Sequence, residues 1–322
     1  MRRLRVGLVS WAHVHAPGLA RTLATLDQVE FVGSFDDSGT AHEGRTHPTL
    51  DGLLRASEAV VIVSTNVSHH RYTLAAAAAR VHVLCEKPLA TTIADAQAMI
   101  DACRVSGVQL GVALPVRSSP AMIALKDAIG RGTLGTIRAV RATNPGQYPG
   151  RWFGDPHEAG GGAVMDHTIH VVDALRWLLE DEVVRVHAEL GSFLYGLPVE
   201  DCGLLTLELA GGAFASIDCS WSRPATYPTW GGVTLHVVGD RGTVDVDVFR
   251  QSLTHYDDAT GVTRLVGWGD DLNALMVGSF VDAILAGRPV PISGVDGLRS
   301  LEVAAAAYRS AELRRPVAIV EL

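Results

Sequence analysis

Strand-like and helix-like segments alternate along the first 115 residues, and this alternation constrains the fold more than any other feature of the sequence. Five short apolar runs have the length and the branched residues of buried strands: 4–9, 29–35, 59–63, 81–85 and 108–112. Helix-forming stretches at 16–26, 68–80 and 93–106 separate most of them. Such alternation predicts a parallel, doubly wound sheet.

After Pro115 the pattern changes. Helices are expected at 121–129 and 163–179, with a loop rich in Gly, Pro and Trp at 144–162 between them. A strand is expected at 136–143, before that loop. Further strand-like runs follow the second helix, and the turn signals between them predict an antiparallel meander: 183–193, 202–209, 213–221, 232–238, 243–248 and 262–266. Two helices near 272–286 and 295–310 precede the end. We therefore predict an α/β plus α+β protein, with a Rossmann domain at 1–118 and an open, mostly antiparallel sheet domain at 119–322.

Composition narrows the class of protein. A hydrophobic content of 48% with 19% charged residues is typical of a compact globular chain. The net charge of −8 argues against a nucleic-acid surface, and no apolar run is long enough for a membrane span. The first apolar run is too short and too charged for a signal peptide. The four cysteines form no CxxC, so neither a zinc ribbon nor a disulfide framework is indicated. We expect a cytoplasmic protein that binds neither nucleic acid nor membrane.

A charged pair follows the buried run at 81–85. Pro88 cannot extend a strand and keeps Lys87 extended, so Glu86 and Lys87 stand just beyond a strand's carboxyl end. Open α/β sheets bind their ligands at that edge. Taken alone, the pair is best explained as an ordinary Glu and Lys at the protein surface. A role in a functional site is indicated only by the surrounding sequence pattern.

The turn after the first strand lies where a dinucleotide-binding fold has GxGxxG. Ser10, Ala12 and His15 occupy the three glycine positions, with Trp11 and His13 between them. Ser and Ala keep the backbone accessible, whereas His15 does not match a packing glycine. Asp36 ends the second strand and suits a contact to an adenosine ribose 2′-hydroxyl, although a turn Asp is an equally good explanation.

A second group of polar residues follows the run of three glycines at 160–162. Asp166 and His170 are four residues apart and share one face of the expected helix, with Asp173 one turn further on. A histidine beside a carboxylate is a good proton acceptor near neutral pH, since its ordinary pKa is about 6.5. The alternative is a merely polar helix face.

Together these pieces resemble the family of glucose-fructose oxidoreductase, inositol dehydrogenase and their relatives (Gfo/Idh/MocA). The resemblance rests on the order and spacing of the segments at 60–69, 81–90, 132–137 and 160–173, and on Arg117 and Pro120. It implies a Rossmann domain that binds NAD(P), with Lys87, Asp166 and His170 as the catalytic residues and a Lys87–Pro88 bond that can be cis. Two departures from the family pattern are the missing loop glycines and Ser64-Thr65-Asn66 in place of Thr-Pro-Asn.

The expected site follows from the resemblance and the local patterns. The cofactor, NAD with NADP as a possibility, is expected to contact Ser10, Trp11, Ala12, His13, Asp36, Ser64, Thr65, Asn66, His69, Glu86 and Lys87. The substrate is expected to contact Arg117, Trp152, His157, Asp166, His167 and His170. No metal is expected. His170 would accept the hydroxyl proton with Asp166 orienting it, and Lys87 would hold the hydroxyl oxygen.

These expectations describe an oxidoreductase that moves a hydride between a nicotinamide cofactor and a secondary alcohol of a sugar, cyclitol or related polyol. A homo-oligomer, dimer or tetramer, is expected to form through the C-terminal sheet. Two alternatives remain open. His13-Val14-His15 after a first strand also resembles the HxH of metal-dependent amidohydrolases, which need an eight-stranded barrel. The same fold without turnover would make a sugar-responsive binding protein.

Overall fold

The computed structural model describes residues 2–37, 44–227, 229–250, 252–257, 261–267 and 269–322. They form two compact units that interleave along the chain. The first unit comprises Met1–Pro115, Pro149–Gly161 and Asn273–Glu302, and the second comprises Val116–Tyr148, Gly162–Leu272 and Val303–Leu322. No helix within these described ranges combines the length and the apolarity that a membrane span requires.

The first unit contains the predicted parallel sheet. Its strands are β1 (Leu4–Val9), β2 (Val29–Phe35), β3 (Ala59–Ile62), β4 (His82–Cys85) and β5 (Leu110–Val112), in the spatial order β2-β1-β3-β4-β5. Neighbouring strands are parallel throughout, so the doubly wound prediction is confirmed. β2 and β3 lie on opposite sides of β1, so the order of the strands reverses there. A crevice for a ligand is expected at such a switch point.

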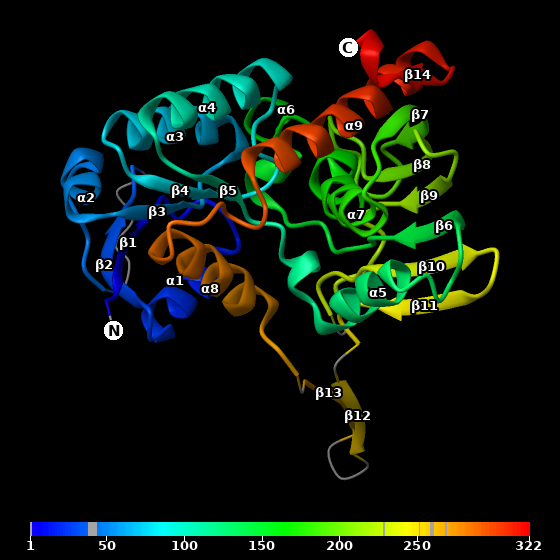
Figure 1. Ribbon diagram of the computed structural model, residues 1–322, viewed down its shortest axis with the longest axis horizontal. Helices are drawn as coiled ribbons and strands as arrows, with labels where there is room; N and C mark the ends of the chain where they lie inside the picture. Colours follow the sequence, from blue (N-terminus) through cyan, green and yellow to red (C-terminus); the bar gives the residue numbers. More distant parts are fainter. Residues whose placement is uncertain (1, 38–43, 228, 251, 258–260, 268) are drawn as a thin grey trace. The chain divides into compact units, whose positions relative to one another are not determined.

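Helices cover both faces of this sheet (Figure 1). The helices α3 (His69–Ala78) and α4 (Ile93–Ser106) lie on one face, and α1 (Ala16–Thr25) and α8 (Leu272–Leu285) on the other. Apolar side chains of α1 and α8 share one core with β1 and β3. Every residue of β3 is buried, as expected for a strand covered on both faces. A short helix that the sequence did not predict, α2 (Leu50–Ala56), is capped by the Thr49 hydroxyl. Its seven residues are too few for a clear helical period.

The second unit contains a seven-stranded sheet in the order β11-β10-β6-β9-β8-β7-β14. The strands are β6 (Ile137–Thr143), β7 (Val183–Gly191), β8 (Cys202–Leu209), β9 (Phe214–Asp218), β10 (Thr234–Gly239), β11 (Thr243–Asp247) and β14 (Val317–Ala318). The sheet is mostly antiparallel, as predicted, but the simple meander is wrong because β6 lies between β9 and β10 and runs parallel to β9. A separate hairpin pairs β12 (Ser252–Asp257) with β13 (Val262–Gly267), and β12 was not predicted.

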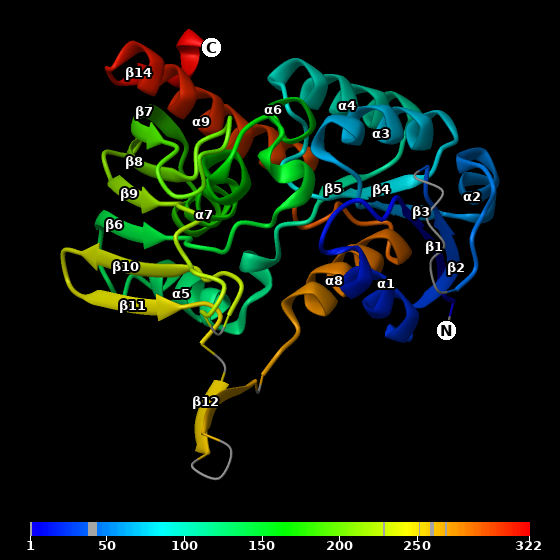
Figure 2. The ribbon, with the colours of Figure 1, turned by 180° about the vertical axis from the view of Figure 1, so that it is seen from behind.

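One face of the seven-stranded sheet is covered by helices (Figure 2). The helices α5 (Pro120–Gly130) and α7 (Ala163–Leu179) pack against that face. The C-terminal part of α9 (Gly294–Leu313) packs in the same core. Along β8, buried and exposed residues alternate strictly, so the opposite face of the strand points outward. The short elements that remain to be named are η1 (Asn66–Ser68), η2 (Pro115–Ser118), η3 (Arg151–Gly154), α6 (Pro156–Ala159) and η4 (Ile319–Glu321).

Candidate active site

The loop after β1 keeps a glycine-like backbone without glycine. Ser10 has a φ of 71°, the left-handed conformation that the first glycine of such a loop permits. The Ser10 hydroxyl accepts from the Ala12 amide at 3.3 Å, and His13 Nδ1 accepts from the His15 amide at 3.1 Å. Trp11 packs against the core of the first unit. Side chains of the loop therefore bond two of its own amides.

The strand β4 delivers Glu86 and Lys87 to the same edge of the sheet. Both residues are buried, with exposures of 2% and 4%, and the Lys87–Pro88 bond is cis, as the resemblance implied. His15 Nδ1 donates to Glu86 Oε1 at 2.9 Å, and the Lys87 amide donates to Glu86 Oε2 at 3.1 Å. Burial alone would raise the pKa of Glu86, but the neighbouring charges of His15, His13 and Lys87 together lower it well below its usual value.

The loop after β3 completes this edge of the first unit. Asn66 donates from Nδ2 to the Ala159 carbonyl at 2.8 Å, and His69 Nδ1 donates to the Pro88 carbonyl at 2.8 Å. Burial lowers the pKa of His69 and so favours the neutral ring, in which Nδ1 carries the proton donated to Pro88. Ser64 and Thr65 are joined by a bond from the Ser64 hydroxyl to the Thr65 carbonyl. The bond from His69 holds the turn that follows Lys87.

The segment 149–161 brings two expected substrate residues to the first unit. Trp152 Nε1 donates to the Ala12 carbonyl at 3.0 Å, and its ring stacks on Phe153 at a centroid distance of 4.0 Å. The Phe153 ring also contacts the His13 ring edge-on at 5.2 Å. Trp152 thus packs against the loop that follows β1. The side chain of His157 is 79% exposed and lies beside Glu158.

In the second unit, the contacts at the start of α7 explain the last glycine of the run, Gly162. The Glu200 carboxylate accepts the amides of Gly162 and Val164 and the hydroxyl of Tyr308, and so satisfies donors at the helix N-terminus. A Cβ on Gly162 would lie 1.9 Å from the Glu200 carbonyl oxygen. Only glycine fits at this position. Burial raises the pKa of Glu200 despite the hydrogen bonds that oppose it.

Asp166 lies in the first turn of α7 and is held from two sides. Trp221 is fully buried and donates from Nε1 to Asp166 Oδ2 at 3.1 Å, while His167 Nε2 lies 3.2 Å from the same oxygen. His167 is itself wedged against the chain, because a Cβ on Gly146 would lie 2.5 Å from His167 Cε1. His170 follows one turn along the helix and is partly exposed. The Asp166 carboxylate therefore has a fixed orientation within the second unit.

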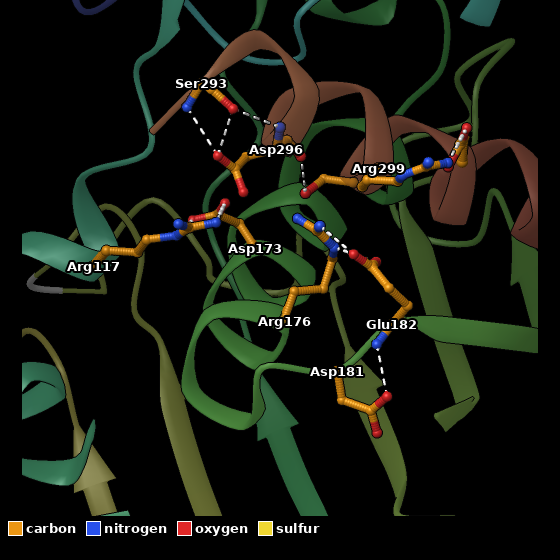
Figure 3. Close-up of polar contacts among 10 residues, drawn as sticks. Arg117, Asp173, Arg176, Asp181, Glu182, Ser293, Asp296 and Arg299 are labelled. Atoms are coloured by element: carbon orange, nitrogen blue, oxygen red, sulfur yellow. Dashed lines mark hydrogen bonds and ion pairs between the residues drawn. The ribbon is translucent and has the colours of Figure 1, made fainter. Parts of the chain in front are cut away.

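Arg117 and Asp173 form a bidentate ion pair (Figure 3). Arg117 Nε donates to Asp173 Oδ2 at 2.7 Å, and a second guanidinium N–H donates to Oδ1. Asp173 is fully buried, and its pairing with Arg117 ties η2 to the middle of α7. On the same helix, Arg176 forms a second two-pronged pair with Glu182. Asp173, the third polar residue of the pattern predicted for α7, is therefore paired with Arg117 of the same unit.

The His13 and His15 imidazoles and the Glu86 carboxylate bring potential ligand atoms within 4.8 Å of one another. The sequence alternative that used this histidine pair, a metal-dependent amidohydrolase, is nevertheless wrong. It requires eight βα units closed into a barrel, whereas the first unit has an open five-stranded sheet and the second unit a mixed sheet.

Three groups of contacts were not predicted from the sequence. His15 is the partner of Glu86, and Glu200, Trp221 and Tyr308 surround the start of α7. Arg71 and Tyr72, on α3, contact Asp37 beyond the end of β2. Each contacts a residue that is at least 34 positions away in the sequence. No local spacing marks such partners. The sequence places Trp221 at the end of a strand-like run, but it does not indicate the hydrogen bond from Trp221 to Asp166.

A five-stranded Rossmann sheet with a modified dinucleotide loop, combined with a second unit built on an open sheet, defines an NAD-binding oxidoreductase. Residues 11–114 match the family model of the oxidoreductase family with the NAD-binding Rossmann fold, and residues 122–245 match the GFO/IDH/MocA C-terminal domain. The chain belongs to the Gfo/Idh/MocA family of oxidoreductases.

Relatives and solved structures agree with this assignment. Myo-inositol 2-dehydrogenase of Thermotoga maritima is 29% identical over 82% of this chain and 80% of its own. The 1,5-anhydro-D-fructose reductase of Ensifer adhaerens is 42% identical over 39% of this chain and 38% of its own. The crystal structure of GenD2 from gentamicin A biosynthesis, in complex with NAD, covers 99% of this chain and 97% of its own, with 27% identity and a TM-score of 0.88.

Proposed function

We propose that this protein transfers a hydride between NAD and a secondary alcohol of a sugar, cyclitol or related polyol. The observation that carries the proposal is the buried Glu86-Lys87 pair at the carboxyl end of β4, on the edge that also carries the loop after β1. Several relatives have names that include inositol 2-dehydrogenase, anhydrofructose reductase and levoglucosan dehydrogenase. Their named compounds are hydroxylated rings, which supports the substrate class.

The residues of the first unit fit a dinucleotide. Ser10 has the backbone conformation of the first loop glycine, and Asp36 directly follows β2, where an acidic residue accepts from the ribose 2′-hydroxyl. The Ser10 hydroxyl and His13 Nδ1 each accept a loop amide and so fix the backbone of this loop. We assign Ser10, Trp11, Ala12 and His13 to the pyrophosphate half of the site. Asn66 and Glu86 are assigned to the nicotinamide half, together with Ser64, Thr65 and His69.

In the proposed reaction the cofactor accepts or supplies the hydride, and side chains of the protein accept or return the hydroxyl proton. His170 is proposed as the general base for the hydroxyl proton, because an imidazole titrates near neutral pH. Asp166, fixed by Trp221, is the carboxylate one turn before it. Lys87 is proposed to hold the hydroxyl oxygen and to stabilise its developing negative charge.

The oligomeric state is a further part of the proposal. The outer face of the seven-stranded sheet exposes large apolar side chains, with Leu204 at 59% and Phe214 at 55% exposure. Leu190, Phe193 and Leu204 line a hollow near one end of β8. Monomeric proteins rarely leave large apolar patches uncovered. We infer that a second copy of the chain covers this face.

A cofactor-turnover screen tests the proposal. The protein is incubated with NAD and either myo-inositol, D-glucose or sorbitol, and in the reverse direction with NADH and 1,5-anhydro-D-fructose, while the nicotinamide absorbance is followed. With a substrate found in this way, His170→Ala is expected to lower kcat by about 10²–10⁴-fold, the usual contribution of a positioned general base. Lys87→Ala should reduce it at least as much. NAD affinity should stay within about threefold of wild type, a free-energy change well under 1 kcal/mol.

The matched control is His236→Ala, which removes an imidazole that pairs with Asp245 on the edge of the sheet. It should leave kcat unchanged. Wild-type turnover in His170→Ala would refute the proposed base. Tight NAD binding without turnover of any hydroxylated ring in a wider panel would instead favour the non-catalytic, sugar-responsive alternative.

A further inference from the structure

A group of three side chains lies at the carboxyl end of β2, one residue beyond Asp36. The Asp37 carboxylate accepts from the Tyr72 hydroxyl at 2.6 Å and forms an ion pair with the Arg71 guanidinium through the same oxygen. Arg71 also donates to the Tyr72 hydroxyl at 2.9 Å, and its guanidinium carbon lies 4.5 Å from the centre of the Tyr72 ring. The aromatic ring and the carboxylate therefore fix the position of the guanidinium.

Arg71 is well placed to meet a ligand from solvent. Its side chain is 59% exposed and that of Asp37 is 41% exposed, whereas Tyr72 beneath them is buried. Burial, the hydrogen bond to Asp37 and the charges of Asp37 and Asp36 raise the pKa of Tyr72. Asp36 thus acts electrostatically on the same ring. Two carboxylates and one guanidinium meet at this end of the strand.

This position has a known use in dinucleotide-binding folds. An acidic residue at the end of the second strand accepts from the ribose 2′-hydroxyl of NAD, whereas a nearby arginine accommodates the 2′-phosphate of NADP. Arginine suits a phosphate because its planar guanidinium can donate two parallel hydrogen bonds. The chain has both residue types here, but the arginine is held by a carboxylate.

We propose that the Asp37–Arg71 pair sets the cofactor preference of this enzyme by keeping a potential 2′-phosphate ligand, Arg71, occupied. The proposal rests on NAD binding by the first unit and assigns roles to Asp37, Arg71 and Tyr72 in addition to that of Asp36. In the wild type, the paired guanidinium and the carboxylate of Asp36 leave no net positive charge for a 2′-phosphate. Removing the charge of Asp37 releases Arg71, while the Tyr72 ring still supports it.

A purely structural role for the pair makes a different prediction. Exposed ion pairs contribute little to stability because water screens them and ordering two long side chains costs entropy. Neutralising Asp37 should therefore leave the fold and its melting temperature almost unchanged. A structural pair would leave the affinity for NADP⁺ unchanged as well, so cofactor titration separates the two roles.

The test is isothermal titration calorimetry of NAD⁺ and NADP⁺ against the full chain and three variants. Asp37→Asn should tighten NADP⁺ binding about tenfold and change NAD⁺ binding by less than about threefold. The double variant Asp37→Asn with Arg71→Ala should lose that gain, because the released guanidinium is absent. The control Asp101→Asn neutralises the acidic partner of Arg104 in an exposed pair on α4, and should change neither affinity.

Three outcomes would overturn the proposal: unchanged NADP⁺ affinity in Asp37→Asn, a gain that persists in the double variant, or an equal gain in Asp101→Asn. A gain that persists in the double variant would mean that loss of the Asp37 charge itself, and not the release of Arg71, favours the phosphate. An equal gain in Asp101→Asn would mean that the overall charge of the unit does so. Failure of the wild type to bind NAD⁺ would instead contradict the proposed function and its cofactor site. Circular dichroism of each variant confirms that the fold is intact.

Discussion

At the scale of single residues, Glu86 shows how this chain keeps an ionised group inside its sheet edge. The residue is buried, and desolvation alone would favour the neutral acid. The charges of His15, His13 and Lys87 and the hydrogen bond from His15 outweigh that effect and lower the pKa below its ordinary value of 4.5. The folded state therefore binds the Glu86 proton less tightly than the unfolded chain does.

Glu86→Gln tests this balance through the pH dependence of stability. Because the folded pKa is lowered, the stabilisation is complete above pH 4.5 and is lost as the pH falls toward the folded pKa. The variant should be less stable than wild type by about 1–3 kcal/mol at pH 7, the usual cost of removing a buried charged partner. Below pH 4.5, that difference should shrink by roughly 1.4 kcal/mol per pH unit. Urea unfolding at pH 7, 4.5 and 3.5 measures it.

Glu30→Gln is the control, since it makes the same substitution at an exposed residue of β2. Its stability difference from wild type should be small at each pH. A difference for Glu86→Gln that stays constant between pH 7 and 3.5 would contradict the electrostatic account. It would mean that the shape of the side chain, and not its charge, matters at this position.

The role of a residue could be predicted from the sequence only where its spacing from other residues, or a family pattern, indicates that role. Lys87 follows an apolar strand and Asp166 precedes His170 by one helical turn, so both were recognisable, although their catalytic roles stay predictions. The pair of Asp37 with Arg71 was not recognisable, because an exposed arginine on a helix has many possible partners. Nor does spacing alone separate a substrate contact from a structural one, and Arg117, which pairs with Asp173, is the clearest example.

At the scale of elements, the N-terminus of α7 decides where Asp166 stands. The helix begins directly after Gly162, and Glu200 accepts amides of the first turn while Tyr308 donates to Glu200. Orphan amides at a helix start require such acceptors. Gly162, the last of the three glycines, is thus required by packing at the start of α7.

Gly162→Ala tests that requirement. The new Cβ would lie 1.9 Å from the Glu200 carbonyl oxygen, so the backbone at the start of α7 must shift. We expect a loss of about 1–3 kcal/mol in stability, as for overpacked sites. Because Asp166 would move with the first turn, we also expect a clear fall in kcat for any substrate the screen finds. Thermal unfolding and steady-state kinetics measure the two effects.

The matched control is Gly278→Ala in α8, where an added Cβ meets nothing within 4 Å and the backbone is helical. Alanine is favoured over glycine inside a helix, so this variant should gain roughly 0.5–1 kcal/mol. If Gly162→Ala behaved like Gly278→Ala, the proposed role of the glycine at the start of α7 would be wrong.

Element types were easier to predict than element neighbours. Alternating strands and helices fixed the parallel sheet, because each crossover must return in the same direction. The position of β6 between β9 and β10 was not predictable, since the sequence period indicates which residues face the core but not which strand lies alongside. The strand β12 was missed because the run 252–257 mixes Ser, Thr, His and Asp with few apolar residues.

At the scale of the whole molecule, the outer face of the seven-stranded sheet remains to be accounted for. Leu204 on β8 and Phe214 on β9 project from the same face, and each is more than half exposed. A sheet with one helix-covered face normally presents polar residues on the other. These two apolar residues are the reason for proposing that a homo-oligomer forms through this face.

Leu204→Asp with Phe214→Asp should dissociate that assembly. Placing two carboxylates in an apolar interface leaves them unpaired and desolvated, which costs several kcal/mol per interface. In the monomer both positions face water, so the fold itself should tolerate the change. Light scattering after size-exclusion chromatography should give a multiple of 34.2 kDa for the wild type and 34.2 kDa for the variant. Val105→Asp, at a 79% exposed position of α4, is the control and should leave the assembly unchanged. A wild type of monomer mass at micromolar concentration, or a variant that stays assembled, would exclude this face as the interface.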